Sequence, residues 1–297
     1  MSDLAIAVVA GLGGMLGWGI ADFLAKKTID ELGDVVSLVW AHVFGFAVFV
    51  VLAVVRLVIA DGGPAVPPSG AVWLAVLAFG VLQAIVYLLV YRGFGKGQVA
   101  VLNPVFASFS GLTALLSIVF FGEMVRGPLL LTLAAIFVGI LMLSLDVDAL
   151  RQRRVSLGRV PGLPEIALAT VLAAVWTVFW YQFVNGRDWF WYAFYMYLFM
   201  TIALWLFARV RRVRLVVPAT RLWFQLGLIG AFEVGAYVSI SLGYSLTTRT
   251  SVVALLSGAF SLPTIVLARA FLKERVTGLQ TAGSAVVIFG IMLLAAV

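Results

Sequence analysis

The sequence contains no cysteine and a single histidine, His42. The absence of cysteine excludes disulfides, thiol nucleophiles and cysteine-based metal sites. One histidine cannot form a histidine-based metal site by itself, and no cluster of carboxylates accompanies it. We therefore expect no metal and no other cofactor. We interpret His42 first as a helix-contact residue and second as a proton carrier, the role for which histidine is generally suited.

Charged residues are also scarce, at 11% of the chain, whereas hydrophobic residues make up 64% and the mean hydropathy is +1.15. Soluble domains average about half apolar and a quarter charged residues, so the excess apolar side chains are expected to face lipid. No basic stretch precedes the first apolar segment, so no cleavable signal peptide is expected. The net charge of +7 comes from basic residues in short loops, which favours a membrane surface over nucleic acid as the partner.

Long apolar segments dominate what is present. A membrane-spanning helix needs about 20 mostly apolar residues. Ten segments meet this requirement, at residues 4–25, 35–59, 70–91, 98–121, 128–146, 164–184, 189–209, 221–244, 250–271 and 278–296. Strands are not expected, since a membrane barrel would need short segments of alternating hydrophobicity. The sequence predicts an all-α membrane protein with ten transmembrane helices.

The two halves of the chain match each other at an offset of about 150 residues. Residues 121–127 correspond to 272–278, and residues 136–141 correspond to 287–292. In the third helix of each half, Gly80, Gln83, Tyr87 and Gly93 correspond to Gly230, Glu233, Tyr237 and Gly243. Five helices per half, an odd number, give the halves opposite orientations. Such inverted repeats are typical of secondary transporters with a site between the repeats near the membrane midplane.

Short motifs in each half resemble the EamA-type repeat of the drug/metabolite transporter superfamily. These motifs are Trp18-Gly19, Gly122-Glu123, Lys273-Glu274-Arg275 and the preceding Pro263. Thr177 stands where the pattern has glycine after Trp176, and Pro104 lies further from Glu123 than the pattern expects. The resemblance implies a ten-helix carrier, commonly an exporter of amino acids or other small metabolites. We predict one such repeat over residues 1–148, a basic linker over 149–163 and a second repeat over 164–297.

Glu233 is the clearest candidate functional residue. It lies near the middle of an apolar segment, between Phe232 and Val234. A charged group at membrane depth costs about 2.5–3.5 kcal/mol on insertion scales, so it needs a reason to be there. We predict that Glu233 binds substrate or carries a coupling proton. The alternative is a hydrogen-bonded carboxyl that only joins two helices. Its repeat mate Gln83 is expected to face it across the pseudo-twofold axis.

Three tyrosines follow these residues along the same two helices. Tyr87 and Tyr237 stand one turn on from Gln83 and Glu233, on the same helix face. Their phenols offer hydrogen bonds and flat walls for an organic solute, and ordinary packing is an equally good interpretation. Tyr91 lies near a helix end beside Arg92 and is expected in the interfacial aromatic belt.

The first helix supplies Trp18, Asp22 and Lys26, which share one face at a spacing of four residues. Asp22 is expected either to pair with Lys26 or to contact a substrate amine, and it is a second candidate for proton coupling. Trp18 and its repeat mate Trp176 are expected to cap the central site from both repeats. Simple packing is the alternative for both tryptophans.

Proline marks two helix irregularities, at Asn103-Pro104 and at Pro263 in the matching helix of the other half. Proline frees a carbonyl about one turn upstream, and such breaks occur where backbone lines a cavity. Asn103 is therefore a predicted substrate-site residue. Glu123 and Glu274 lie in loops at opposite membrane faces, where local capping or pairing is their simplest role.

The basic residues predict the orientation. Sixteen of the 20 Lys and Arg residues fall in loops after the odd-numbered helices, and the other four are Arg56, Arg126, Arg187 and Arg249. The positive-inside rule places the odd loops in the cytoplasm and both termini outside the cell (inner) membrane. Members of the family that the motifs resemble commonly keep both termini in the cytoplasm instead.

These observations predict a secondary transporter that exports small organic metabolites such as amino acids by alternating access, with protons as a candidate coupling ion. The expected partners are the organic solute and the lipid bilayer, and the chain is expected to work as a monomer or homodimer without enzymatic activity. One alternative is a channel, which would favour an oligomeric pore with rings of one residue type. The other is a membrane-embedded enzyme, which would need clustered Asp, His or Glu near one interface.

Overall fold

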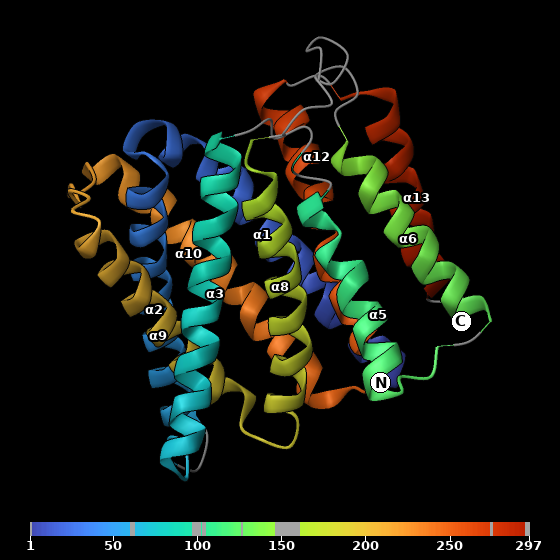
Figure 1. Cartoon of the computed structure of the whole chain (residues 1–297), viewed down its shortest axis with the longest axis horizontal. Coiled ribbons are helices and arrows are strands. Elements are labelled where there is room, and N and C mark those ends of the chain that lie inside the picture. The colour runs from blue at the N-terminus through green and yellow to red at the C-terminus, as the bar shows by residue number, and fades with distance from the viewer. Residues whose placement is uncertain are drawn as a thin grey trace.

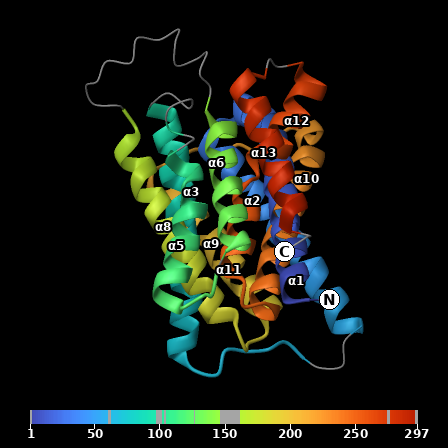
Figure 2. The same cartoon turned by 90° about the vertical axis from the view of Figure 1, so that its right-hand side faces the viewer.

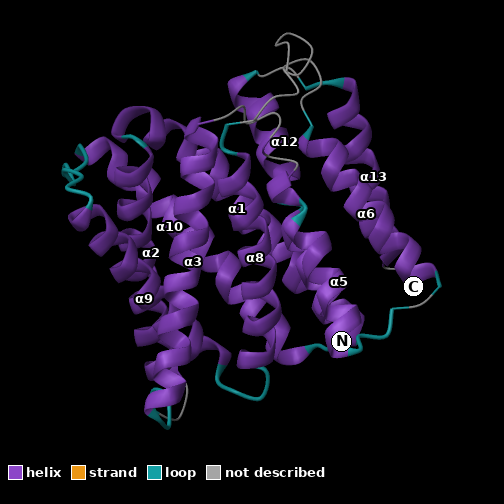
Figure 3. Ribbon diagram, viewed as in Figure 1, coloured by secondary structure: helices purple, strands orange, loops and turns teal. Residues whose placement is uncertain are grey.

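A computed structural model describes residues 2–59, 63–96, 102, 105–125, 127–145, 161–273 and 276–294 of the chain. Within these ranges the regular structure is helical, with no strand (Figures 1 and 3). The helices are α1 (Asp3–Leu32), α2 (Asp34–Ile59), α3 (Gly70–Lys96), α5 (Phe109–Phe121), α6 (Pro128–Ser144), α8 (Leu163–Val184), α9 (Trp189–Val210), α10 (Thr220–Leu246), α11 (Thr250–Gly258), α12 (Ser261–Leu272) and α13 (Gly278–Leu294).

The ten predicted spans correspond to these helices. Over the described ranges, seven spans are long and apolar enough to cross a membrane. Three shorter apolar helices, Val105–Phe121, Pro128–Ser144 and Gly278–Leu294, account for the rest. The outer faces are apolar, as lipid contact requires: Val51, Val54 and Val58 of α2 are more than half exposed. The predicted all-α membrane fold with ten segments is confirmed.

The ninth span is broken in the middle. It consists of α11 and α12, with Ala259 and Phe260 between them. The helix breaks here because Pro263 has no N–H to donate to the carbonyl of Ala259. The irregularity predicted at Pro263 is thus confirmed. Some predictions cannot be compared in the same way, because they lie outside the described residues: Asn103, Pro104, Glu274 and most of the linker 149–163.

The connection between α8 and α9 is a tight turn, as its four-residue length requires. Gly186 adopts a positive φ of 71°, a conformation that glycine tolerates without strain. Asp188 then caps α9 by accepting hydrogen bonds from the backbone N–H groups of Phe190 and Trp191. Arg56 at the end of α2 donates to Asp188 at 2.6 Å, which joins the two repeats at this face.

The two repeats interlock instead of folding side by side. The first helix of each repeat packs on the third helix of the other, as α1 with α10 and α8 with α3. The second helices do the same, as α2 with α10 and α9 with α3. The last helices pair directly, α6 lying beside α13 in both views (Figures 1 and 2). This exchange of partners is what two inverted copies produce around a pseudo-twofold axis.

Matched glycines fix the register of these contacts. A side chain at Gly80 would place its first carbon 2.6 Å from the carbonyl oxygen of Met196 and 2.9 Å from the nitrogen of Met200. A side chain at Gly230 would collide in the same way with the backbone of Ala41 and Gly45. Ala41 and Gly45 therefore correspond to Met196 and Met200, which makes His42 and Tyr197 repeat mates.

Candidate functional site

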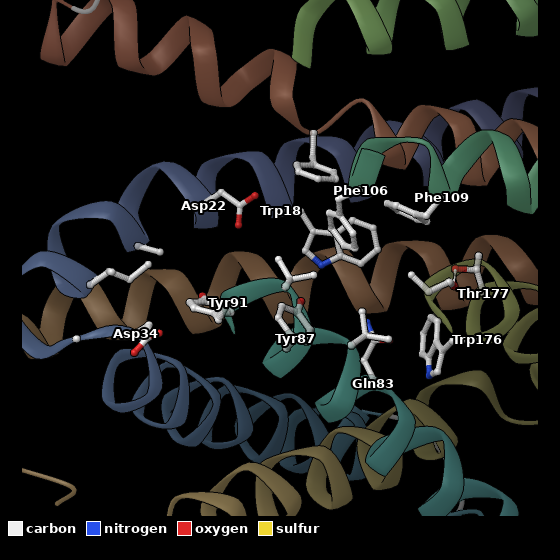
Figure 4. Close-up of a pocket in the computed structure, with 17 residues that line it drawn as sticks. Trp18, Asp22, Asp34, Gln83, Tyr87, Tyr91, Phe106, Phe109, Trp176 and Thr177 are labelled. Carbon is white, nitrogen blue, oxygen red and sulfur yellow. Dashed lines mark hydrogen bonds between the residues drawn. The ribbon is translucent and has the colours of Figure 1, made fainter. Parts of the chain in front are cut away.

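A cavity of about 560 Å³ lies between α1, α3 and α8 (Figure 4). It extends from Asp34, at the start of α2, to Trp176 and Thr177 within α8 (Figure 4). Among the predicted site residues, those that line it are Trp18, Asp22, Gln83, Tyr87 and Trp176. Much of the remaining wall is apolar, contributed by Val86, Val90, Phe106, Phe109, Ala173 and Phe260.

One face of α3 forms a polar stripe along the cavity. Gln83, Tyr87 and Tyr91 follow one another at four-residue intervals and all line the wall (Figure 4). The prediction that Tyr91 belongs to the interfacial belt is therefore wrong. Helix rotation directs its ring towards α1 instead of lipid, and rotation cannot be judged from proximity to a helix end.

The opposite wall belongs to α1. Trp18 and Asp22 lie one turn apart and both line the cavity (Figure 4). The ring of Trp18 packs edge-on against that of Tyr237 at 5.7 Å. Trp18 Nε1 is buried and has no hydrogen-bond partner within the described ranges. The side chain of Lys26, the predicted partner of Asp22, lies outside them.

At the inner end of the cavity a short hydrogen-bond chain joins the two repeats. Gln83 Nε2 donates to the hydroxyl of Tyr237 at 2.9 Å, and that hydroxyl donates to Tyr87 at 3.5 Å. The repeat mates Tyr87 and Tyr237 thus meet directly. Gln83 and Glu233, which were expected to face each other, are instead linked to different tyrosines, because the side chain of Glu233 turns towards α2 and α9.

Glu233 lies in a buried cluster behind the cavity wall. Its Oε1 lies 3.3 Å from His42 Nε2, and its Oε2 accepts a hydrogen bond from Tyr197 at 3.2 Å. Glu233 is 4% exposed and His42 is 1% exposed. Neither residue belongs to the described lining of the cavity. Tyr87 connects the two regions, since it lines the cavity and its ring packs edge-on against His42 at 5.3 Å.

The hydrogen bonds of His42 restrict where protons sit in this cluster. His42 Nδ1 lies 2.9 Å from the carbonyl oxygen of Leu38, which can only accept, so Nδ1 carries a proton. Nε2 then faces Glu233. Nε2 lies 3.3 Å from the Glu233 carboxyl group, and this contact lacks the geometry of a hydrogen bond.

Tyr197 is a site residue that the sequence analysis missed. It is fully buried, donates to Glu233 and stacks on the ring of His42, with centroids 5.4 Å apart and planes 14° apart. Its hydroxyl also fills the space beside Gly45 that a side chain would need. An alignment of the second helices, which pairs Tyr197 with His42, would have identified it.

At the other membrane face, the ends of three helices are tied together. Glu123, after α5, accepts from the backbone N–H of Ser251 at 2.9 Å and from its hydroxyl at 2.5 Å. It therefore caps α11 of the other repeat. The sequence analysis had predicted local capping or pairing instead. Arg249 donates to the carbonyl of Met124 at 2.8 Å and pairs with Asp3 at 3.4 Å. Burial raises the pKa of Glu123 above its usual value, although the hydrogen bonds from Ser251 oppose the shift.

Within the described ranges, no three His, Asp or Glu side chains are close enough together to hold a metal ion. The cavity offers aromatic walls and two carboxylates, and the His42–Glu233 pair lies behind one wall. This arrangement suits reversible binding of a small solute.

Known proteins extend this description. No curated protein matches the chain. A solved structure titled only "Crystal structure of protein" superposes with a TM-score of 0.75 over 97% of this chain and 96% of that one. At 17% sequence identity this likeness shows the fold alone. The EamA-like transporter family matches residues 5–145 and again residues 161–296, once for each repeat. The chain therefore belongs to the EamA-like transporter family of the drug/metabolite transporter superfamily.

Proposed function

We propose that this protein is a secondary transporter that exports small organic metabolites, such as amino acids, by alternating access. The solute binds in the cavity between α1, α3 and α8, against Trp18, Gln83 and Tyr87. The repeats, over residues 1–148 and 164–297, move against each other around this site. Family membership supports transport, and the geometry of the cavity supports the mechanism.

The main observation behind this proposal is an asymmetry between repeat mates. Asp22 and Tyr91 flank the cavity from opposite walls. Their mates in the second repeat are Trp180 and Ser241, which are fully buried and joined by a hydrogen bond of 3.0 Å. One half of the pseudo-symmetric site is open and the other half is packed shut. Exchange of these two arrangements between the repeats would open the site to the other face.

Glu233 is the proposed site of proton coupling, with His42 as its partner. The two side chains lie 3.3 Å apart, are buried, and contact the cavity through Tyr87. Gain or loss of a proton by Glu233 would change the charge of the Glu233–His42 pair. This pair lies next to the helix contacts that differ between the open and the packed arrangement. Asp22, within the cavity, is the second candidate for carrying the coupling proton.

The charge distribution supports an orientation in the cell (inner) membrane. The mouth of the cavity, at Gly33 and Asp34, lies in the loop after the first span, and the loops after odd-numbered spans hold sixteen of the 20 basic residues in the sequence. We place this face in the cytoplasm and both termini outside. The structure then corresponds to an inward-open carrier that accepts solute from the cytoplasm for export.

Counterflow in proteoliposomes tests the proposed function. Vesicles loaded with one unlabelled solute from a panel of amino acids and organic amines should take up the same labelled solute transiently above its equilibrium level. The uptake should saturate with concentration. A channel would give linear, non-accumulating flux, and an enzyme would yield a chemically altered product, so either of those results would replace the proposal.

A pair of cysteine substitutions tests the asymmetry, and the cysteine-free chain makes the test clean. Val90 lines the cavity, whereas its repeat mate Ile240 is 1% exposed. Val90→Cys should react quickly with a membrane-impermeant thiol reagent added at the basic face. Ile240→Cys should react at least about tenfold more slowly from either face, as closed segments open only transiently. Equal rates would contradict the one-sided opening.

Replacement of Glu123 by alanine removes the cap on α11. In the Ile240→Cys background, Glu123→Ala should raise the rate of thiol labelling from the face that holds Glu123.

A further inference from the structure

Two acidic residues line the otherwise aromatic and apolar cavity. In the described part of the lining, the charged side chains are Asp22 and Asp34, and both are carboxylates. Asp22 projects from α1 (Figure 4), and Asp34 is an exposed lining residue at the start of α2. Walls of low dielectric focus the field of such groups into a cleft, which raises the local concentration of cations. Charge alone therefore favours a positively charged solute over an anionic one.

Gln83 supplies a second, independent observation. It is 8% exposed and lines the same cavity. The hydroxyl of Tyr237 accepts from the amide nitrogen of Gln83 at 2.9 Å, and it donates towards Tyr87 and Met200. This leaves Gln83 Oε1 as the free end of the amide, and it is buried without a hydrogen bond from any described residue. A buried acceptor without a donor is unfavourable, so a solute N–H that reaches Oε1 gains affinity.

The aromatic side chains fit the same chemistry. Tyr87, Tyr91 and Trp18 line the cavity around Gln83 and Asp22 (Figure 4). Aromatic faces attract ammonium groups and also pack against a flat apolar body. Trp18 Nε1, buried and without a partner among the described residues, can donate to one neutral acceptor on the solute.

We propose that the transported solute is a protonated organic amine with an aromatic or apolar body. Its N–H groups bind Gln83 Oε1, and its charge is balanced by Asp22. This inference rests on the proposed function and narrows its substrate class. An amino acid fits less well, because its carboxylate would face the two carboxylates of Asp22 and Asp34 and would exchange its water for neutral donors such as the Trp18 indole N–H. A quaternary cation fits less well too, because it has no N–H for Gln83.

A matched series of four phenyl compounds tests this inference by calorimetry on the purified protein in detergent. The series is 2-phenylethylamine, its N,N,N-trimethyl analogue, phenylalanine and 3-phenylpropanoate. We expect the primary amine to bind most tightly. The quaternary analogue and phenylalanine should bind at least about tenfold more weakly, as expected for loss of one charge-assisted hydrogen bond. The anion should not bind measurably.

Three variants assign the affinity to named side chains. Asp22→Asn should weaken binding of the amine at least about tenfold, the scale of a lost charge-assisted bond. Glu31→Gln is the control, because Glu31 lies on the same helix but pairs with Arg221 outside the cavity, and it should leave affinity unchanged. Gln83→Glu keeps an acceptor and adds charge at that position, so it should bind the amine at least as tightly as the unaltered protein. Affinity that is retained or increased cannot arise from misfolding.

The outcomes separate this inference from the proposed function. Tightest binding by phenylalanine or by the anion would overturn the amine assignment and leave the transporter intact. The same holds if Asp22→Asn binds the amine normally while Gln83→Glu weakens it. If none of the four compounds binds, the amine assignment is also overturned, and the counterflow panel still decides whether the protein transports other solutes.

Discussion

Replacement of Glu233 by glutamine is expected to abolish solute-driven proton movement. The amide has the size of the carboxyl group and can still accept from Tyr197, but it cannot take up or release a proton near neutral pH. His42 Nε2 would then face a neutral amide in place of the carboxyl group, so this position could no longer accept or pass on a proton. In proteoliposomes that enclose a pH indicator, addition of a transported solute should acidify or alkalinise wild-type vesicles and leave Glu233→Gln vesicles unchanged.

The control for this variant is Glu31→Gln, the same chemical change at an exposed ion pair with Arg221. Surface pairs contribute about 0–1 kcal/mol, so this variant should behave as the wild type. Counterflow, which needs no proton gradient, should persist in Glu233→Gln if the fold is intact. Undiminished proton movement in Glu233→Gln would exclude Glu233 as the coupling group and make Asp22 the next residue to replace.

Replacement of Gly230 by alanine is expected to cause the largest loss of stability among single-methyl changes in α10. The added carbon would collide with the backbone of Gly45, and backbone cannot move aside as a side chain can. Overpacking of this kind costs about 1–3 kcal/mol, and more where no side chain can yield. The thermal unfolding midpoint in detergent, followed by tryptophan fluorescence, should fall clearly below that of the wild type.

The same helix provides a matched control. Gly227 and Gly235 have no neighbouring atom within 4 Å of an added side-chain carbon. Alanine at either position should be neutral or stabilising by up to about 0.5–1 kcal/mol, because glycine weakens a helix interior. If Gly230→Ala and Gly227→Ala unfold at the same temperature, the close approach of α2 and α10 is not needed for stability. Because Gly230 also positions α10 beside His42, its replacement should impair proton coupling as well.

The architecture could be predicted because the lipid bilayer requires a minimum length of apolar sequence for each span. Each span needs about 20 apolar residues, and this length can be counted along the chain. The duplication is also a linear signal, and it correctly paired Gly80 with Gly230 and Tyr87 with Tyr237. The broken ninth span followed from Pro263, whose missing N–H is a property of the residue itself.

Less of the candidate site could be predicted in this way. Trp18, Asp22, Gln83, Tyr87 and Trp176 were identified as candidates and do line the cavity, but Tyr91 was assigned to the wrong environment. Helix periodicity gives the face that residues share, and it does not say whether that face meets lipid, another helix or a cavity. The capping of α11 by Glu123 was missed for a related reason, since the partner lies 128 residues away.

Composition, apolar length and internal duplication by themselves determined that this chain is an inverted-repeat helical membrane protein, because these properties follow from local transfer energies and can be read residue by residue. The tertiary structure alone decided that Glu233 meets His42 and Tyr197 behind the cavity instead of lying within it. That decision depends on how α2, α9 and α10 rotate and cross. The rotation is set by close contacts such as Gly45 against Gly230, which bring together residues from both repeats.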